Sequence, residues 1–226
     1  MTDSFHALSV RSRRPLLIFA IVMSIVVACL LLILASRGPP EPTYKGLTMV
    51  QWVLAGPTPF QQEAIVILGT NNLQLLVRRL QHDPTKDRVF VLYSRLPARL
   101  QSVKFLQALC AKKFWKARYA EVVLHRLGPR AAPAVPELAE LARGTGQPVA
   151  SPALGVLHDI GEPGIPGLVA GMSNTNQSVR LTALFYLGKH RNFPAAWHAI
   201  TNAFADPDPK VRDAADIASR TNDEAK

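Results

Sequence analysis

Four apolar runs in this chain close with a branched apolar residue followed by glycine, and this recurrence constrains the fold more than any other feature. The pairs are Leu68-Gly69, Leu127-Gly128, Ile160-Gly161 and Leu187-Gly188. The apolar residues before each pair have helical spacing, and glycine is favoured just past the end of a helix. Short helices bury too little surface alone, so we expect antiparallel helix pairs that stack around one continuous core.

The first part of this helical region predicts two consecutive helices. One is expected from Phe60 to Leu68, with Gly69 ending it, and the next covers the run LQLLVRRLQ. Asn71 or Asn72 is expected to cap the second helix through its side chain. Its apolar face comprises Leu73, Leu76, Val77 and Leu80.

Residues 86–118 are less regular than their neighbours. Val89, Val91 and Tyr93 alternate with other residues, which fits a short strand, but we favour helices interrupted at Pro97 because every neighbouring segment is helical. The interval from Gly69 to Gly128 is nearly twice that from Gly128 to Gly161, and more than twice that from Gly161 to Gly188. The region is therefore predicted to be an elaborated repeat or an inserted helix pair.

Three helix-pair units and a final half-unit follow residue 119. Prolines stand where second helices begin, and Val179-Arg180 and Val211-Arg212 stand at matching helix starts in successive units. The residues expected to face inward are Ala120, Val123, Leu124, Leu127, Val135, Leu138, Leu141, Leu154, Leu157, Ile160, Ile165, Leu168, Met172, Val179, Ala183, Leu184, Leu187, Ala196, Ile200, Phe204, Val211, Ala214, Ala215 and Ala218.

Residues 16–35 predict a transmembrane helix. Fourteen of these twenty residues are Leu, Ile, Val or Phe, and none is charged or proline. A helix of that length spans about 30 Å, the thickness of the hydrocarbon core of a bilayer. Arg11, Arg13 and Arg14 precede the span, so the positive-inside rule places residues 1–15 in the cytoplasm and residues 37–226 outside it. We expect a single-pass protein of the cell (inner) membrane.

Two alternatives for the N-terminal segment remain open. Cleavage after Ala35 would make it a signal peptide, although its apolar core is longer than such signals usually have. Val26-Val27-Ala28-Cys29 resembles a bacterial lipobox with Cys29 as the lipidated residue, but residues 30–35 are still apolar. The expected organisation is a tail (1–15), a transmembrane helix (16–35), a proline-rich spacer (36–47), a helical domain (48–220) and a polar tail (221–226).

The helical pattern resembles HEAT-like repeats of the short bacterial type over roughly residues 60–220. The resemblance is carried by VRLTALFYLG, LGKH, DPDPKVRDAADIAS, Ala120, Leu124, Leu127-Gly128, Ala132, Pro133, Pro136 and Leu138. With the apolar segment, the spacer and YKGLTMVQWVL, the chain is similar to membrane-anchored HEAT-repeat proteins of bacteria. The resemblance implies an all-α fold: one transmembrane helix, then a right-handed α-solenoid of antiparallel helix pairs that binds other macromolecules.

The positive charge of the chain is concentrated in one segment. Residues 78–130 hold thirteen Lys and Arg against three Asp and Glu, and the whole chain has a net charge of +10. Such a field favours anionic lipid, a cell-envelope polymer or nucleic acid, or it simply solvates one face of the protein. The expected location outside the cytoplasm disfavours nucleic acid. The candidate anionic-partner surface comprises Arg78, Arg79, Arg88, Lys104, Lys112, Lys113, Lys116 and Arg118.

Aromatic residues are interleaved with these cations in the segment KKFWKARY, residues 112–119. Cations and aromatics together suit a membrane surface or nucleic acid. In the alternative interpretation Phe114, Trp115 and Tyr119 belong to the core, and the lysines line the exposed side.

No catalytic, cofactor-binding or metal-binding residue is predicted. The sequence has no phosphate-binding glycine loop, nucleophile elbow or zinc-ligand spacing. His82-Asp83 and His158-Asp159 could together hold iron, as His-Glu pairs do in the HEAT-repeat deoxyhypusine hydroxylases, and this is the enzyme alternative. The leading expectation is a non-catalytic, membrane-anchored scaffold for a partner protein. The second is a basic adaptor whose 78–130 surface docks on anionic lipid or an envelope polymer.

Overall fold

The computed structural model describes residues 41–56, 58–83, 86–144 and 146–220, with the isolated positions 19, 23, 24 and 27. The chain divides into two compact units, Met1–Glu41 and Pro42–Lys226. Within the described residues no helix is both long and apolar enough to cross a bilayer. The predicted span at 16–35, Cys29, Ala35 and both terminal tails lie almost entirely outside those residues.

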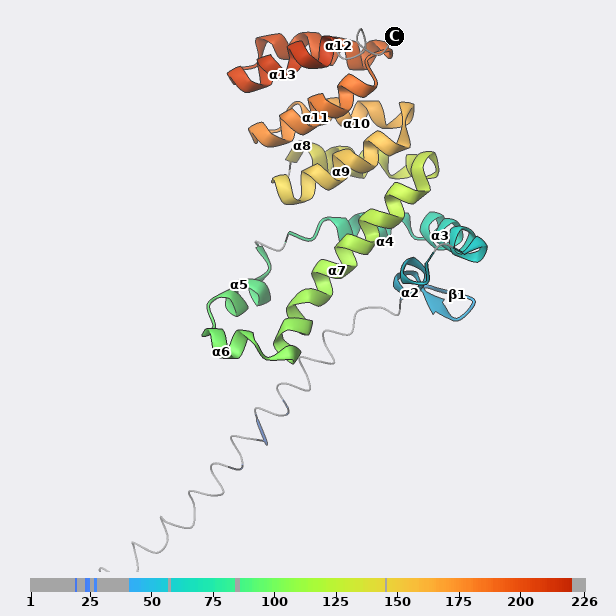
Figure 1. Ribbon diagram of the computed structural model, residues 1–226, viewed down its shortest axis with the longest axis vertical. Coiled ribbons are helices and arrows are strands. Elements are labelled where there is room, and N and C mark those ends of the chain that lie inside the picture. Colours follow the sequence, from blue (N-terminus) through green and yellow to red (C-terminus); the bar gives the residue numbers. More distant parts are fainter. Residues whose placement is uncertain are drawn as a thin grey trace, which may run out of the picture. The chain divides into compact units, whose positions relative to one another are not determined.

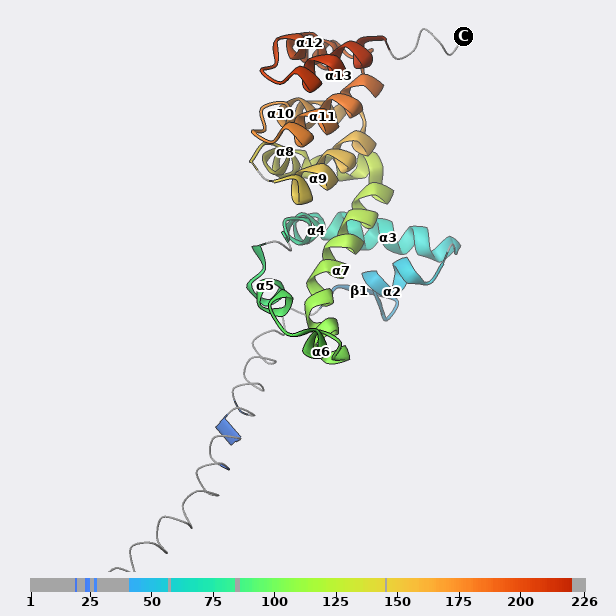
Figure 2. The ribbon, with the colours of Figure 1, turned by 60° about the vertical axis from the view of Figure 1, so that its left-hand side comes forward.

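The described part of the second unit is helical apart from one short hairpin, which confirms the all-α prediction. Figures 1 and 2 show helices α8 to α13 following one another in layers. The elements in chain order are β1 (Thr43–Tyr44), β2 (Leu47–Thr48), α2 (Met49–Leu54), α3 (Pro59–Asn71), α4 (Leu73–Leu80), α5 (Arg88–Ser94), α6 (Ala98–Gln101), α7 (Lys104–Leu127), the 3₁₀ helix η2 (Gly128–Ala134), α8 (Val135–Gly144), α9 (Gln147–Ile160), η3 (Glu162–Gly164), α10 (Ile165–Gly171), α11 (Gln177–Lys189), α12 (Pro194–Asn202), η4 (Ala203–Ala205) and α13 (Pro209–Arg220).

The hairpin of β1 and β2 was not predicted from the sequence. Its strands pair antiparallel through Thr43 opposite Thr48 and Tyr44 opposite Leu47. Trp52 Nε1 donates a hydrogen bond of 3.0 Å to the Tyr44 carbonyl, which holds the hairpin on α2. Two-residue strands are too short to show the alternation from which strands are predicted.

The glycines of the four apolar-glycine pairs have two different roles. Gly128 and Gly161 follow the last residues of α7 and α9 with φ of +52° and +84°, so they end helices as predicted. Gly69 and Gly188 instead lie inside α3 and α11, and the prediction that Gly69 ends its helix is wrong. A Cβ at Gly69 would lie 2.8 Å from Leu127 Cδ1, so its absence allows α3 to approach α7 closely.

The junction between α3 and α4 also differs from the prediction. Asn72 stands at the N-cap position of α4, but its side chain makes no capping hydrogen bond there. Its Nδ2 donates instead to the Leu68 carbonyl at 2.8 Å, which stabilises the end of α3. The predicted apolar face of α4 is confirmed, because Leu76, Val77 and Leu80 are buried.

The irregular region contains three helices and no strand among its described residues. The preference for helices over a strand at residues 89–93 is confirmed, since α5 covers this stretch. Helix α6 begins directly after Pro97, where the interruption was predicted. Helix α7 then runs for 24 residues and includes the first helix of the unit predicted at 119–144.

One hydrophobic core extends from Met49 to Ala218. Helices α7, α9, α11 and α13 contact one another in series, and α8, α10 and α12 form a second series. Nearly all predicted inward residues are buried or partly buried in this core. Phe204 is the exception: it is exposed, because the chain at this point is the 3₁₀ helix η4 and not a continuation of α12.

The loops before α11 and α13 contain the same hydrogen bonds in successive units. Before α11, the Arg180 guanidinium donates to the carbonyls of Asn174 and Thr175, and the Asn174 side chain accepts from the Asn176 N–H. Before α13, the Arg212 guanidinium donates in the same way to the carbonyls of Asp206 and Pro207, and the Asp206 side chain accepts from the Asp208 N–H.

Candidate functional site

The predicted basic surface is distributed over three helices. Its residues lie on α4, α5 and α7, and both α4 and α5 contact α7. Arg78, Lys104 and Arg118 are exposed, whereas Arg79 and Lys116 are half-buried. Arg118 is engaged by Glu121 at 2.8 Å. The side chains of Arg88, Lys112 and Lys113 lie outside the described part of the chain, so a single continuous patch stays a prediction.

Two of the aromatic residues among these cations are exposed. The side chains of Phe114 and Trp115 are 49% and 51% accessible. Their rings meet edge to face with centroids 5.7 Å apart, and the centroid of the Trp115 ring is 6.1 Å from that of the half-buried Tyr119. The interpretation of Phe114 and Trp115 as core residues is therefore wrong.

His125 lies between two carboxylates at the boundary of α7 and α9. Its Nδ1 is 2.6 Å from Asp159 Oδ2 on α9, and its Nε2 is 3.9 Å from Glu121 Oε1, one turn earlier on α7. The contact with Glu121 and the shorter hydrogen bond with Asp159 outweigh burial and raise the pKa of His125. The contact with His125, followed by that with Arg118, lowers the pKa of Glu121 against the effect of burial.

A second histidine link joins α9 to α11. His158 Nδ1 and His190 Nε2 are 2.8 Å apart, and the His158 ring stacks on Tyr186 with centroids 4.8 Å apart. Burial, followed by the charge at His190, lowers the pKa of His158. Burial also raises the pKa of Tyr186. The two links form one polar row along the C-terminal halves of α7, α9 and α11.

A glycine leaves room for this row. A Cβ at Gly155 would lie 3.1 Å from His125 Cε1 and 3.3 Å from the Tyr186 hydroxyl oxygen. Among the described residues no hydroxyl or thiol hydrogen-bonds to His125. The contacts of the row link α7 to α9 and α9 to the C-terminal end of α11.

This polar row was not predicted, although the sequence carries a signal for it. His125, His158 and His190 follow one another at nearly equal intervals, close to the period of the repeat. Equal spacing along stacked units places side chains next to one another in space. Metal-ligand spacings within short segments, by contrast, do not reveal such a row.

The four residues of the iron-site alternative, His82, Asp83, His158 and Asp159, do not form a metal-binding group among the described residues. In the described part of the chain no three His, Cys, Asp or Glu side chains are grouped so that they could hold a metal ion. His82 instead pairs with Asp87 at 3.7 Å in the segment after α4. His158 and Asp159, on α9, bond to His190 and His125 respectively.

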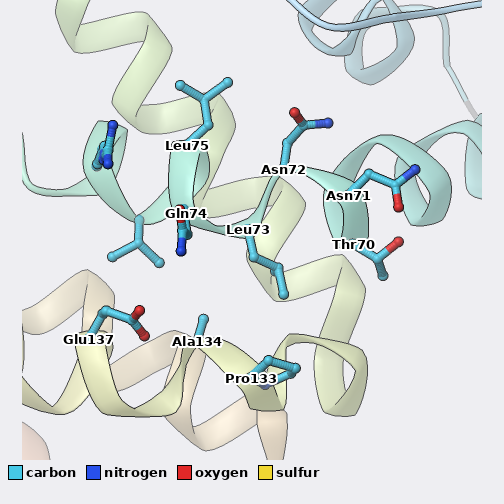
Figure 3. A pocket seen from close by; sticks show the side chains of 11 residues that line it. Thr70, Asn71, Asn72, Leu73, Gln74, Leu75, Pro133, Ala134 and Glu137 are labelled. Carbon is cyan, nitrogen blue, oxygen red and sulfur yellow. The ribbon is translucent and has the colours of Figure 1, made fainter.

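A polar pocket of about 470 Å³ lies between α4 and the segment η2–α8 (Figure 3). One wall is formed by the end of α3 and by α4, and the other by η2 and α8. In Figure 3 Gln74 points from α4 toward the opposite wall, where Ala134 and Glu137 lie. The lining residues are Thr70, Asn71, Asn72, Leu73, Gln74, Leu75, Val77, Arg78, Pro133, Ala134 and Glu137.

A second pocket, of about 550 Å³, lies between α11 and α13 and is mainly apolar. Phe185 and Ile217 line it and are 60% and 63% exposed. Lys189 Nζ stands 4.7 Å from the centroid of the Phe185 ring. We call this surface the α11–α13 groove; its lining residues are Leu181, Phe185, Gly188, Lys189, Ala214, Ile217 and Ala218.

Comparisons of the chain with protein-family models, with curated proteins and with solved structures find no match.

Proposed function

We propose that residues 48–220 form an α-solenoid of HEAT-like helix pairs that binds a partner protein as a scaffold and not as an enzyme. Residues 16–35 would anchor the domain in the cell membrane and display it outside the cytoplasm. The anchor rests on its sequence alone, on twenty uncharged and predominantly apolar residues and the arginines before them.

Two features of the helical domain support the solenoid. Each helix of residues 135–220 packs mainly on helices that are close to it in sequence, as in repeat proteins. The repeated hydrogen bonds before α11 and α13 support it further, because two successive units are alike in their loops as well as in their helices.

Partner binding is supported above all by the α11–α13 groove. Large apolar side chains that gather in an exposed hollow are typical of protein–protein contact sites. Phe185 and Ile217 expose most of their surface there, and Lys189 provides a charged rim. The groove thus offers the apolar centre and polar edge of an interface.

Photo-crosslinking in membranes tests this proposal. A benzoylphenylalanine placed at Ile217 of the full-length chain is expected to capture a discrete partner, and the substitution Phe185→Ser is expected to abolish the adduct. The matched control is the same probe at Asp213, which is exposed on α13 but does not line the groove. Equal labelling from both positions, unaffected by Phe185→Ser, would count against a specific interface.

A second candidate function is docking on anionic lipid, and the exposure of Phe114 and Trp115 favours it. Aromatic rings beside cations suit the head-group region of a bilayer. Co-sedimentation of residues 42–226 with anionic vesicles at low salt is expected to decrease in the variant F114S/W115S and not in F185S. Equal recovery with neutral vesicles would exclude this function.

A further inference from the structure

The polar pocket between α4 and η2–α8 is a second surface, distinct from the α11–α13 groove. We propose that it binds an extended peptide segment that carries one acidic and one basic side chain. The inference is independent of the proposed partner at the groove, because the two pockets share no residue.

Four polar side chains of this pocket are free to meet a ligand. Thr70 and Asn72 are already engaged, since they donate hydrogen bonds to the carbonyls of Val66 and Leu68. No hydrogen bond or ion pair within the described part of the chain involves the side chains of the other four. They are Asn71, Gln74, Arg78 and Glu137, and all four are exposed.

Among the described residues, Arg78 and Glu137 in the pocket have no ion-pair partner, whereas the next acidic residue of α8 has one. Glu140, one turn after Glu137 on α8, is paired with Arg143 at 2.9 Å. Within the described residues Glu137 has no such partner, and neither does Arg78 on α4. The pocket thus presents a cation from one wall and an anion from the other. A ligand with both charges would pair with each of them.

The remaining free groups favour a peptide over another zwitterion. Asn71 and Gln74 each offer one hydrogen-bond donor group and one acceptor, which matches the N–H and C=O groups of an extended backbone. A zwitterionic lipid head group has an ammonium donor and phosphate acceptors but no such alternation. The apolar part of the lining, including Leu73, Pro133 and Ala134, suits small side chains between the two charged ones.

Fluorescence anisotropy with the full-length chain in detergent micelles tests the proposal. The probes are capped, labelled hexapeptides of Gly, Ala and Ser that contain Asp before Lys, Lys before Asp, Asp alone, Lys alone or neither. One peptide with both charges is expected to bind best. R78E and E137R are each expected to weaken it about tenfold, because attraction becomes repulsion. The double variant R78E/E137R is expected to prefer the peptide with the opposite order of charges.

The controls separate this site from its surroundings. E140R alters a paired residue of α8 outside the pocket, and F185S alters the α11–α13 groove, so both are expected to leave peptide affinity unchanged. All variants concern exposed positions, and circular dichroism checks their folding. Equal affinity for all five peptides, no binding, or insensitivity to R78E and E137R would overturn the proposal. Displacement of the peptide by phosphatidylethanolamine vesicles, but not by phosphatidylcholine vesicles, would overturn it in favour of a lipid head group.

Discussion

His158 and His190 share a hydrogen bond of 2.8 Å between Nδ1 and Nε2, and this bond joins α9 to the C-cap residue of α11. At least one of the two rings must be neutral, since two imidazolium ions offer only donors. Burial, followed by the charges at His190, Lys189 and His125, lowers the pKa of His158 and outweighs the opposing effect of the Asp159 carboxylate, which raises it. The link between these helices is therefore sensitive to acid.

The substitution His158→Asn is expected to reduce the loss of stability on acidification. The folded pKa of His158 lies below the ordinary value of 6.5, so the unfolded chain takes up the proton first as the pH falls. The contribution of the neutral ring is therefore present above about pH 6.5 and is lost as the pH falls through the folded pKa. Urea unfolding of residues 42–226 at about pH 8 and pH 5.5 measures the effect. The free energy of unfolding differs between the two pH values, and we expect this difference to be a few tenths of a kcal/mol smaller in His158→Asn than in the wild type. The effect is small because the ring is partly exposed.

The matched control for this prediction is His198→Asn. His198 is exposed on α12, and its contact, with Asn202, lies within the same helix. The variant is expected to keep the pH dependence of the wild type. A wild-type pH dependence in His158→Asn as well would contradict the assigned role of the His158–His190 bond.

The His125–Asp159 pair is expected to have the opposite pH dependence. The folded pKa of His125 is raised, so its contribution is fully present below about pH 6.5 and is lost as the pH rises through the folded pKa. Asp159→Asn is expected to cost about 0.5–1 kcal/mol at pH 6 and much less at pH 9. Asp213→Asn, at an exposed position of α13, serves as control. An equal loss from Asp159→Asn at both pH values would argue against a charged pair.

Gly164→Ala and Gly144→Ala are expected to change stability in opposite directions. A Cβ at Gly164 would collide with the carbonyl oxygen of Leu157, and a backbone atom cannot move aside as a side chain can. We expect a loss of about 1–3 kcal/mol from this overpacking. A Cβ at Gly144 meets no atom within 4 Å, so alanine there is expected to be neutral or to stabilise α8 by up to about 1 kcal/mol. The measurement is the free energy of unfolding of each variant. Equal values for Gly164→Ala and Gly144→Ala would contradict the close packing at Gly164.

Removal of Arg180 is expected to destabilise the protein strongly. Its guanidinium donates to both carboxylate oxygens of Asp206 at 2.9 and 3.0 Å, and the two side chains are only 11% and 9% exposed. Arg180→Met would leave the largely buried Asp206 carboxylate without its guanidinium partner, although the Asp208 N–H would still donate to it, at a cost of about 3 kcal/mol. Arg220→Met breaks the exposed pair with Asp216 and is expected to cost less than about 1 kcal/mol. Similar unfolding midpoints for the two variants would refute a special role for Arg180.

Much of the fold could be predicted because helical periodicity records which face of a helix is buried. Leu124, Leu157 and Leu184 were placed inward from their spacing alone, and all three are fully buried. The match of Val179-Arg180 with Val211-Arg212 also predicted a real equivalence, since both arginines close the same kind of loop. Both signals lie within one segment of the sequence, and neither requires knowledge of the helix that packs against that segment.

The features that were missed or misplaced depend on contacts between distant segments. Gly69 follows an apolar run as Gly128 does, yet it stays helical because it packs against Leu127, which is far from it in the sequence. His125 meets Asp159 across two helices, and nothing near either residue indicates it. The pocket between α4 and α8 likewise combines residues that only packing brings together.

Helix α7 has a mechanical consequence. It contacts α2 to α6 as well as α9, and its 24 residues include neither glycine nor proline. At about 1.5 Å per residue it extends about 36 Å without a point at which helices commonly bend. A force applied to α7 where α5 and α6 contact it would therefore displace α7 as a rigid rod and move α9 with it. A load on the first helices would in this way reach the later ones.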